Sequence, residues 1–132
     1  MKNMNWKYVK QLVKKNSIEE FEEKNGIKFP QDLKDCLIKN NGGRPFLKYY
    51  DIGNEKNKEF KTLLSFNEKD IENIYKYFPL DSSDKTIIPF ASDSAGNFFV
   101  IKNSSIGLWD HELDKVYILA STFSEFLEKL HE

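Results

Sequence analysis

The chain has 132 residues, which suits one compact domain whose core needs no disulfide or metal to hold it together. Charged residues make up 31% and aromatic residues 14%, a composition that excludes an intrinsically disordered chain. The formal net charge is -1 and Arg44 is the only arginine, so neither long-range attraction nor guanidinium recognition favours nucleic acid. We therefore expect one domain over residues 1–132, with no direct nucleic-acid or membrane partner.

Cysteine usage and targeting signals indicate the compartment. Cys36 is the only cysteine, which excludes an intramolecular disulfide and a zinc site with several thiolates from one chain. The opening stretch MKNMNWKYVKQLVKKN carries lysines but no apolar signal-peptide core, and no later stretch is long and apolar enough for a spanning helix. We expect a cytoplasmic protein.

The first third of the chain is predicted to be helical. Residues 5–16 carry apolar side chains at helical spacing, which predicts a first short helix packed through Trp6, Val9, Leu12 and Val13. Ser17 and Glu20 form a capping-box pattern that begins a second helix, and Gly26 ends it. A third helix begins near Pro30 and Asp32 and packs through Leu33, Cys36 and Leu37.

The sequence NNGGRP, residues 40–45, ends the third helix. Its end is marked by Asn41, Gly42 and Gly43, and the two glycines allow a sharp turn and the close approach of another segment. Asn41 is expected to satisfy the end of its own helix, while Arg44 supplies the one guanidinium for a bidentate contact. We give the structural role of this stretch more weight than a role in binding.

Strand-like stretches follow Pro45. FLKYYDI and FKTLLSF, separated by the polar GNEKNKE, predict a hairpin. Asn67 is expected to cap a helix over EKDIENIYKYF that ends at Pro79 and packs through Ile71, Ile74, Tyr75 and Phe78. TIIPFA, NFFVIK, SIGLWDH and KVYILA then predict an antiparallel meander, with Pro89 at a sheet edge or a bulge.

Thr122 or Ser121 is expected to cap a last helix, which docks through Phe123, Phe126, Leu127 and Leu130. The order of elements lacks the regular alternation of strand and helix that builds a parallel sheet. The predicted fold class is α+β, with a central antiparallel sheet of about six strands flanked by N-terminal, middle and C-terminal helices.

Two stretches of the meander contain residues that could take part in catalysis or ligand binding. WDHE, residues 109–112, places His111 between two carboxylates, but catalysis there needs a nucleophile or acid from elsewhere, and a hydrogen-bonded turn is preferred. A metal role is disfavoured because the other histidine, His131, lies near the C-terminus. SDSAGN, residues 92–97, lacks the spacing and lysine of a phosphate-binding loop. It is expected to turn with Gly96 at positive φ, while Asp93 and Asn97 bond to the backbone.

Cys36 lies on an apolar helix face without a neighbouring histidine, so a small core side chain is favoured over a nucleophile. We expect no catalytic residue, no metal site and no cofactor. Tyr49, Tyr50 and Trp109 are interpreted as core residues or as interface anchors, and a regular strand places one of the two tyrosines off the core face. Acidic turns, if they gather on one side, would suit a cationic partner. The candidate partner contacts are Tyr49, Tyr50, Asp93, Asn97, Trp109, Asp110 and Glu112.

Three blocks of the chain together resemble the SUKH superfamily, which contains fungal cell-wall assembly regulators and many bacterial immunity proteins against polymorphic toxins. The first block is IEEFEEKNGIKFPQDLKDCLIKNNGG, the second is IIPFASDSAGNFFVI, and the third is WDHE before a final FSEFL helix. The positions that carry the first block are Ile18, Phe21, Glu22, Gly26, Pro30, Asp32, Leu37, Asn41, Gly42 and Gly43. Pro89 and Gly96 are the corresponding structural positions of the second block.

The resemblance implies a binding domain without enzymatic activity. We expect a monomer or a weak homodimer. Immunity members of the superfamily bind and neutralise a cognate toxin, commonly a nuclease carried at the C-terminus of a large secreted protein, and they remain in the cytoplasm. The first alternative is an adaptor or regulator of a cellular protein, related to the cell-wall assembly regulators. The second is an enzyme that uses His111 with Asp110 or Asp93.

Overall fold

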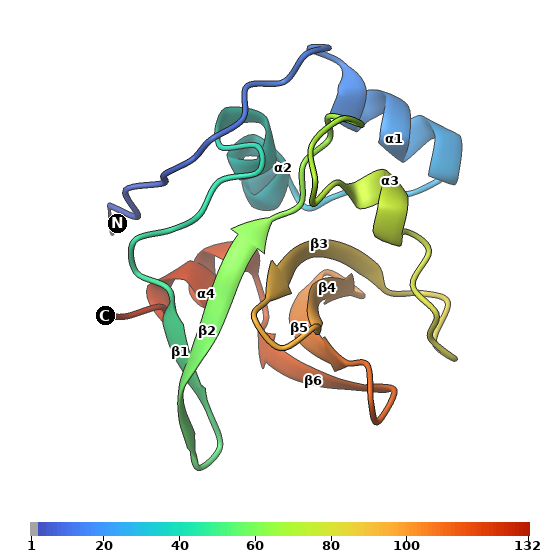
Figure 1. The fold of residues 1–132 in the computed structure, drawn as a ribbon. Helices are drawn as coiled ribbons and strands as arrows, with labels where there is room; N and C mark the ends of the chain where they lie inside the picture. The colour runs from blue at the N-terminus through green and yellow to red at the C-terminus, as the bar shows by residue number, and fades with distance from the viewer. Residues whose placement is uncertain (1–2) are drawn as a thin grey trace.

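The computed structural model of the protein describes residues 3–132 and confirms the predicted α+β class. The helices α1 (Ser17–Asn25) and α2 (Gln31–Lys39) come first, followed by the strands β1 (Tyr49–Ile52) and β2 (Glu55–Leu63). The short helix α3 (Ile74–Tyr77) precedes β3 (Ile88–Asp93), β4 (Phe98–Lys102), β5 (Ser105–Asp110) and β6 (Lys115–Ala120). The helix α4 (Phe123–Glu128) follows β6, and Figure 1 shows α1, α2 and α3 grouped above the sheet.

The six strands form one antiparallel sheet in the order β1-β2-β3-β4-β5-β6, so both the predicted hairpin and the predicted meander are confirmed. Pro89 lies at an irregularity in the register between β3 and β4. The pairing of β3 with β2 begins only at Ala91, so the proline needs no donor toward β2. This arrangement agrees with the predicted bulge.

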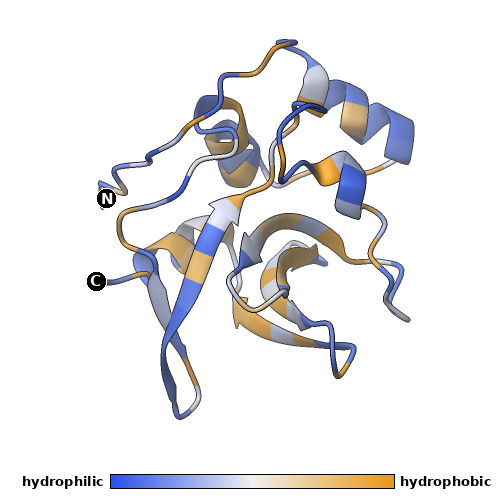
Figure 2. Ribbon diagram, in the orientation of Figure 1, coloured by the Kyte–Doolittle hydropathy of each residue, from blue (hydrophilic) through white to orange (hydrophobic). Residues whose placement is uncertain are grey.

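The core lies between the sheet and the helices, and aromatic rings fill its centre. The ring of Phe99 on β4 lies 4.8 Å from that of Phe60 and 5.5 Å from that of Phe126, measured between centroids. In Figure 2, hydrophobic residues colour much of β3 to β6, whereas the hairpin of β1 and β2 is mainly hydrophilic. Because neighbouring residues of a strand face opposite sides, Val100 points the other way and joins a smaller cluster with Leu80, Ile87 and Trp109.

The two consecutive tyrosines of β1 divide between core and surface as predicted. Tyr50 is buried, with its ring centroid 5.5 Å from that of Phe99, whereas Tyr49 is half-buried. The Tyr50 hydroxyl has no hydrogen-bond partner within residues 3–132, and burial raises the pKa of this phenol.

Removal of that hydroxyl tests its environment. An unsatisfied buried polar group costs free energy, so Tyr50→Phe should leave the free energy of unfolding unchanged or raise it by up to about 1 kcal/mol. Urea denaturation of both proteins measures the difference. A loss of more than about 1 kcal/mol would show that the hydroxyl makes a stabilising hydrogen bond.

The predicted first helix over residues 5–16 is wrong, because this segment is extended and pairs with the NNGGRP stretch. Lys7 and Arg44 exchange two backbone hydrogen bonds of 2.8 Å, and the Lys10 N–H donates to the Asn41 carbonyl oxygen at 2.7 Å. Tyr8 has a positive φ of 58°, which no helix contains. Tertiary pairing thus overrides the local apolar spacing, and it leaves Val13 83% exposed.

Asn41 is the residue that holds this pairing in place, and its predicted role at the end of its own helix is wrong. The buried side-chain amide donates to the Lys10 carbonyl oxygen at 2.8 Å and to the Ser65 hydroxyl at 3.0 Å, and its oxygen accepts from the Phe66 N–H at 2.8 Å. The helix α2 ends at Lys39, and Asn40 is its C-cap, with its backbone N–H donating to the Cys36 carbonyl oxygen. A Cβ on Gly43 would lie 2.8 Å from the Asn40 carbonyl oxygen, so this close turn requires glycine.

The middle helix is shorter than predicted. Asn67 does not cap it, because its side chain accepts from the Val13 N–H and donates to the Gln11 carbonyl oxygen. Residues 67–73 form turns, Ile71 is exposed, and α3 begins after Asn73, whose side chain accepts from the Lys76 N–H at 3.0 Å. Polar side chains that bond to distant backbone groups here compete with helix formation.

The predicted helix ends agree with the structure in part. Gly26 ends α1 in the left-handed conformation, and Thr122 caps α4 by accepting from the Glu125 N–H at 3.0 Å. The predicted capping box is wrong, because the Ser17 hydroxyl donates to the Lys14 carbonyl oxygen instead. Cys36 is half-buried, and burial raises the pKa of its thiol to about 11, as suits a packing residue.

Candidate partner-binding surfaces

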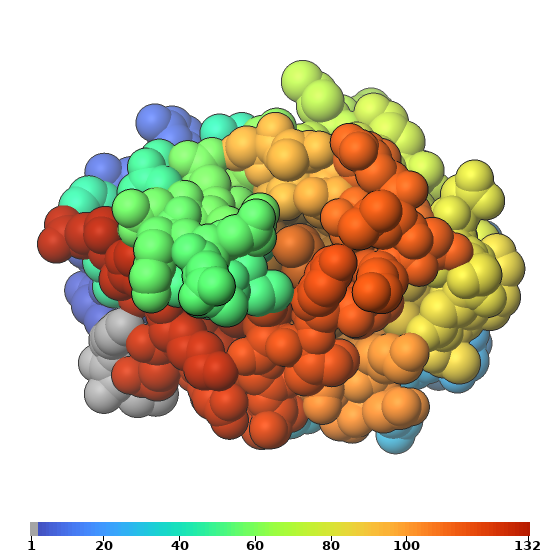
Figure 3. Space-filling model, turned by 90° about the horizontal axis from the view of Figure 1, so that it is seen from below, coloured from blue at the N-terminus to red at the C-terminus, as the bar shows by residue number. Residues whose placement is uncertain are grey.

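Three turns meet at one end of the sheet, since alternate turns of an antiparallel meander lie at the same end. They join β1 to β2 at residues 53–54, β3 to β4 at residues 94–97, and β5 to β6 at residues 111–114. We call these residues the turn end. Figure 3 looks onto it and shows the three turns around a shallow hollow. The predicted WDHE and SDSAGN stretches both contribute to this surface.

Hydrogen bonds through Asn97 join the second and third of these turns. The buried Asp93 carboxylate accepts from the Ala95 and Asn97 backbone N–H groups at 2.9 and 2.8 Å, so it forms the predicted backbone contacts. The Asn97 side-chain oxygen lies 3.1 Å from the His111 backbone nitrogen and 2.6 Å from its ring Nδ1. Gly96 has the predicted positive φ, 88°, and a Cβ there would lie 3.3 Å from the His111 ring. The turns therefore form a preorganised surface.

Asp110 and Asp114 order the third turn from within. Asp110 accepts from the Glu112 and Leu113 backbone N–H groups, at 2.9 and 3.2 Å. Asp114 accepts from the Ser83 N–H, the Ser82 hydroxyl and the indole N–H of the buried Trp109. Hydrogen bonds from Ser83, Trp109 and Ser82 hold the pKa of the Asp114 carboxyl well below its ordinary 3.8.

The depressed pKa predicts a pH dependence for stability. The pKa of this carboxyl is lower in the folded state than in the unfolded state. At pH values above the unfolded-state pKa the ionised carboxylate therefore stabilises the fold, and this contribution is lost as the pH falls toward the folded-state pKa. Asp114→Asn should therefore have a lower midpoint of thermal unfolding than the native chain at neutral pH. On acidification to about pH 3, the midpoint of the variant should fall by less than that of the native chain. Asp81→Asn, which changes an exposed carboxylate on the same loop system, is the control. Equal acid sensitivity of Asp114→Asn and the native chain would contradict the assignment.

The structure divides the predicted contact residues. Tyr50, Asp93 and Trp109 are buried and stabilise the fold, so we remove these three from the expected contact set. Tyr49 pairs through its backbone with His131 at the β1 edge, which separates it from the turn end. Asn97 and Asp110 are half-buried and hold the turns, whereas Glu112 is exposed.

Sequence reasoning missed Leu113, which is 63% exposed at the tip of the third turn. A leucine inside the polar stretch HELDK is the signal that would have indicated it. Not every acidic residue of the loops adds free negative charge: Asp84, between α3 and β3, pairs with Lys102 at 2.6 Å. That hydrogen bond is the main cause that lowers the pKa of Asp84 to about 2. All four residues of the third turn are exposed, and Asp114 uses its carboxylate to bond within the fold, which leaves His111, Glu112 and Leu113 to form the tip.

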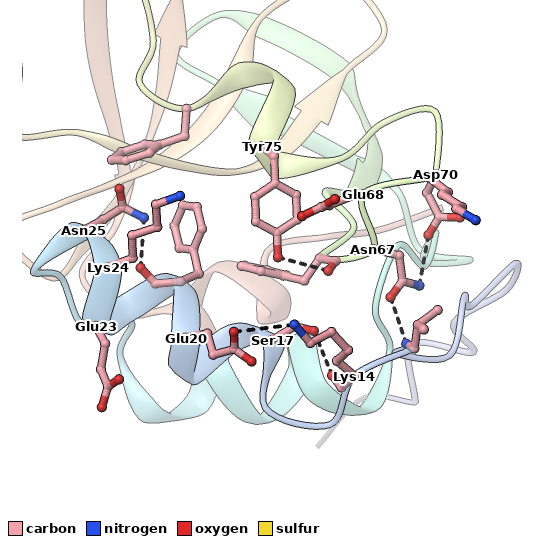
Figure 4. Close-up of a pocket in the computed structure, with 15 residues that line it drawn as sticks. Lys14, Ser17, Glu20, Glu23, Lys24, Asn25, Asn67, Glu68, Asp70 and Tyr75 are labelled. Atoms are coloured by element: carbon pink, nitrogen blue, oxygen red, sulfur yellow. Dashed lines mark hydrogen bonds and ion pairs between the residues drawn. The ribbon is translucent and has the colours of Figure 1, made fainter.

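A second candidate surface is an open groove of about 1030 Å³ between α1 and the turn before α3. Its base is aromatic: the ring centroid of Phe21 lies 5.5 Å from that of Phe66 and 5.9 Å from that of Tyr75. Figure 4 shows Tyr75 reaching between the two walls, where its hydroxyl donates to the Phe66 carbonyl oxygen at 3.1 Å. Sequence reasoning missed this groove because its walls come from distant segments, one of which was assigned to a helix.

Both charges line the rim of this groove. Lys14 and Glu20 form an exposed pair at 3.6 Å, and Asp70 accepts from the Ser65 hydroxyl and the Asn67 amide. Within residues 3–132, no group of three His, Cys, Asp or Glu side chains is placed to hold a metal ion. No helix in the same range is both long and apolar enough to cross a membrane. The groove and the turn end are the two candidate surfaces described so far.

Fold and surfaces define a class of small α+β domain: two opening helices precede a six-stranded antiparallel sheet, a short helix lies between its second and third strands, and one helix closes the chain. The model of the SMI1 / KNR4 family (SUKH-1) matches residues 12–129. The chain therefore belongs to the SMI1 / KNR4 family (SUKH-1), which confirms the resemblance to the SUKH superfamily. A comparison with curated proteins finds no match.

Proposed function

We propose that this protein is a cytoplasmic immunity protein that binds a cognate polymorphic toxin domain, a nuclease, and neutralises it without catalysis. Family membership supports the general class, a binding or regulatory domain. The observation that carries the specific proposal is the turn end, where an exposed leucine and an exposed carboxylate stand on hydrogen-bonded turns.

The physical chemistry of the turn end suits this role. A surface that is already ordered loses little conformational freedom when it binds, so more of the contact energy appears as affinity. Leu113 offers an apolar anchor, and Glu112 beside it offers a carboxylate without a salt-bridge partner within residues 3–132. A nuclease must present cationic groups to hold phosphates, so an acidic and apolar tip complements its active-site rim.

His111 has a structural part in this proposal. Its ring Nδ1 contacts the Asn97 side-chain oxygen, and the ring packs over Gly96. The imidazole thus helps to join the two turns, and His111→Ala should weaken their connection. Full inhibitory activity of a folded His111→Ala protein would exclude the enzymatic alternative, since His111 is its only candidate base.

A titration tests the proposed function directly. The proposed partner is the C-terminal domain of a large exported protein encoded beside this one, and the assay follows its cleavage of nucleic acid. We expect cleavage to fall in proportion to added protein and to stop at a fixed stoichiometry. Undiminished cleavage at a large excess would contradict neutralisation, and stable capture of a non-toxic cellular protein in its place would favour the adaptor alternative.

A further inference from the structure

A cationic and aromatic surface lies at the corner where the N-terminal segment pairs with the NNGGRP stretch. Lys7, Tyr8, Arg44 and Phe46 form this surface, which we call the Arg44 corner, around a pocket of about 280 Å³. Lys7 and Arg44 are antiparallel bridge partners joined by two backbone hydrogen bonds. Figure 1 shows the two segments side by side, away from the turn end at the bottom of the view. The corner is therefore a third surface, and it adjoins the turn end through Glu59, which lines its pocket and accepts a hydrogen bond from the Ser94 hydroxyl.

The cations of this pocket differ in how their charge is balanced. Lys48 pairs with Glu59 at 3.3 Å and Lys61 with Glu72 at 2.8 Å. Within residues 3–132, neither Lys7 nor Arg44 has a carboxylate within salt-bridge distance. Glu59 also lines the pocket, and the charge of Arg44 is one of the causes that lower the pKa of its carboxyl. The corner therefore has two cationic side chains that remain available to an anionic ligand.

Aromatic rings support both cations. The Lys7 ammonium lies 5.6 Å from the centroid of the Phe46 ring, and the Arg44 guanidinium lies 5.9 Å from that of Tyr8. Such contacts limit the conformations of a long cationic side chain and leave its hydrogen-bond donors free. Tyr8 is 71% and Phe46 is 49% exposed, an unusual exposure for two neighbouring large rings.

We propose that the Arg44 corner binds a short acidic segment of a partner protein, with two carboxylates beside an apolar side chain. Antiparallel partners carry their side chains about 5 Å apart at the Cβ atoms, and the long stems of Lys7 and Arg44 can spread to the roughly 6.5 Å between alternate residues of an extended peptide. Arg44 offers a planar fork for one carboxylate, and Lys7 offers a point charge for the other. The exposed ring surfaces of Tyr8 and Phe46 accommodate the apolar side chain.

Nucleic acid fits the corner less well than a peptide. A protein that binds a polyanion tightly neutralises about 6–10 phosphates along a stripe of cations, and the corner offers two unpaired cations. The net charge of -1 also gives no long-range attraction for a polyanion. A short segment with few carboxylates matches both the size and the charge of this surface.

Fluorescence anisotropy with the purified full chain tests this proposal. The probe is a labelled peptide of alternating Glu and Leu residues, and the comparison probes are the same peptide with Gln for Glu and an oligothymidylate of equal length. We expect the acidic peptide to bind, the Gln peptide to bind much more weakly, and added salt to weaken the complex. The Lys7→Ala, Arg44→Ala double variant should bind the acidic peptide about tenfold more weakly, as two exposed charge contacts imply.

The matched control is the Lys69→Ala, Lys85→Ala double variant, which removes the same charge from exposed lysines elsewhere and should bind like the native chain. The proposal fails if the native chain binds the Gln peptide as tightly as the acidic one, or if the control variant loses as much affinity as the corner variant. Tighter binding of oligothymidylate than of the acidic peptide would also overturn it. If the corner variant does not fold, the comparison of peptides on the native chain still decides.

Discussion

A protein that carries Leu113→Asp should fold like the native chain and bind its toxin partner at least about 30-fold more weakly. Leu113 is exposed at the tip of the third turn, so its replacement leaves the core intact. In the complex an apolar anchor becomes desolvated, and a carboxylate at the same place loses the contact and adds a cost of desolvation. Calorimetry with the purified partner measures the affinity, and circular dichroism checks the fold.

Val13→Asp is the matched control for this experiment. Val13 is 83% exposed on the wall of the groove, so the substitution has the same chemistry at a different surface. We expect it to leave the affinity for the toxin unchanged. A loss with Val13→Asp and none with Leu113→Asp would move the contact from the turn end to the groove.

Asn41→Ala should lower the free energy of unfolding by about 3 kcal/mol, because it removes three hydrogen bonds and leaves buried backbone groups without partners. The lost contacts are those to the Lys10 carbonyl oxygen, the Ser65 hydroxyl and the Phe66 N–H. These bonds join the N-terminal segment and the end of β2 to the NNGGRP turn. Urea denaturation measures the change, and backbone amides of residues 7–10 should exchange faster in the variant.

Asn40→Ala provides the comparison one residue earlier. The Asn40 side chain is half-buried, and its amide lies 3.6 Å from the Cys36 sulfur, a weak contact. We expect this variant to lose less than about 1 kcal/mol. Equal losses in the two variants would contradict the special role of Asn41.

Most of the sheet was predicted correctly because the apolar runs that indicate strands are separated by residues that favour turns. Each of the last four strands is a short apolar run bounded by Asn, Asp, Ser or Gly. Because the turns between them are short, consecutive strands pair antiparallel and form a meander. The N-terminal segment shows the limit of this reasoning. The apolar spacing of this segment is typical of a helix. The segment is extended instead, and Asn41 holds it so that Trp6 and Leu12 still pack against the core, partly buried.

The candidate surfaces were less predictable than the fold, because exposure depends on packing between distant segments. Alternation within β1 predicts that one tyrosine leaves the core face, but only the structure shows that Tyr50 is buried. Trp109 resembles an interface anchor in sequence, yet Leu80, Ile87 and Val100 cover it. The turn end was more predictable than these aromatic residues, because the topology of a meander places the polar SDSAGN and WDHE turns side by side.

The central claim, that this chain protects a cell against a cognate toxin, is tested most directly by co-expression with the C-terminal domain of the exported protein encoded beside it. Cell survival is scored first, and recovery of a complex of fixed stoichiometry is scored second. Survival with the native chain and with Val13→Asp, together with death when Leu113→Asp is expressed at an equal level, is the predicted result. Death in the presence of abundant, folded native protein would contradict the claim.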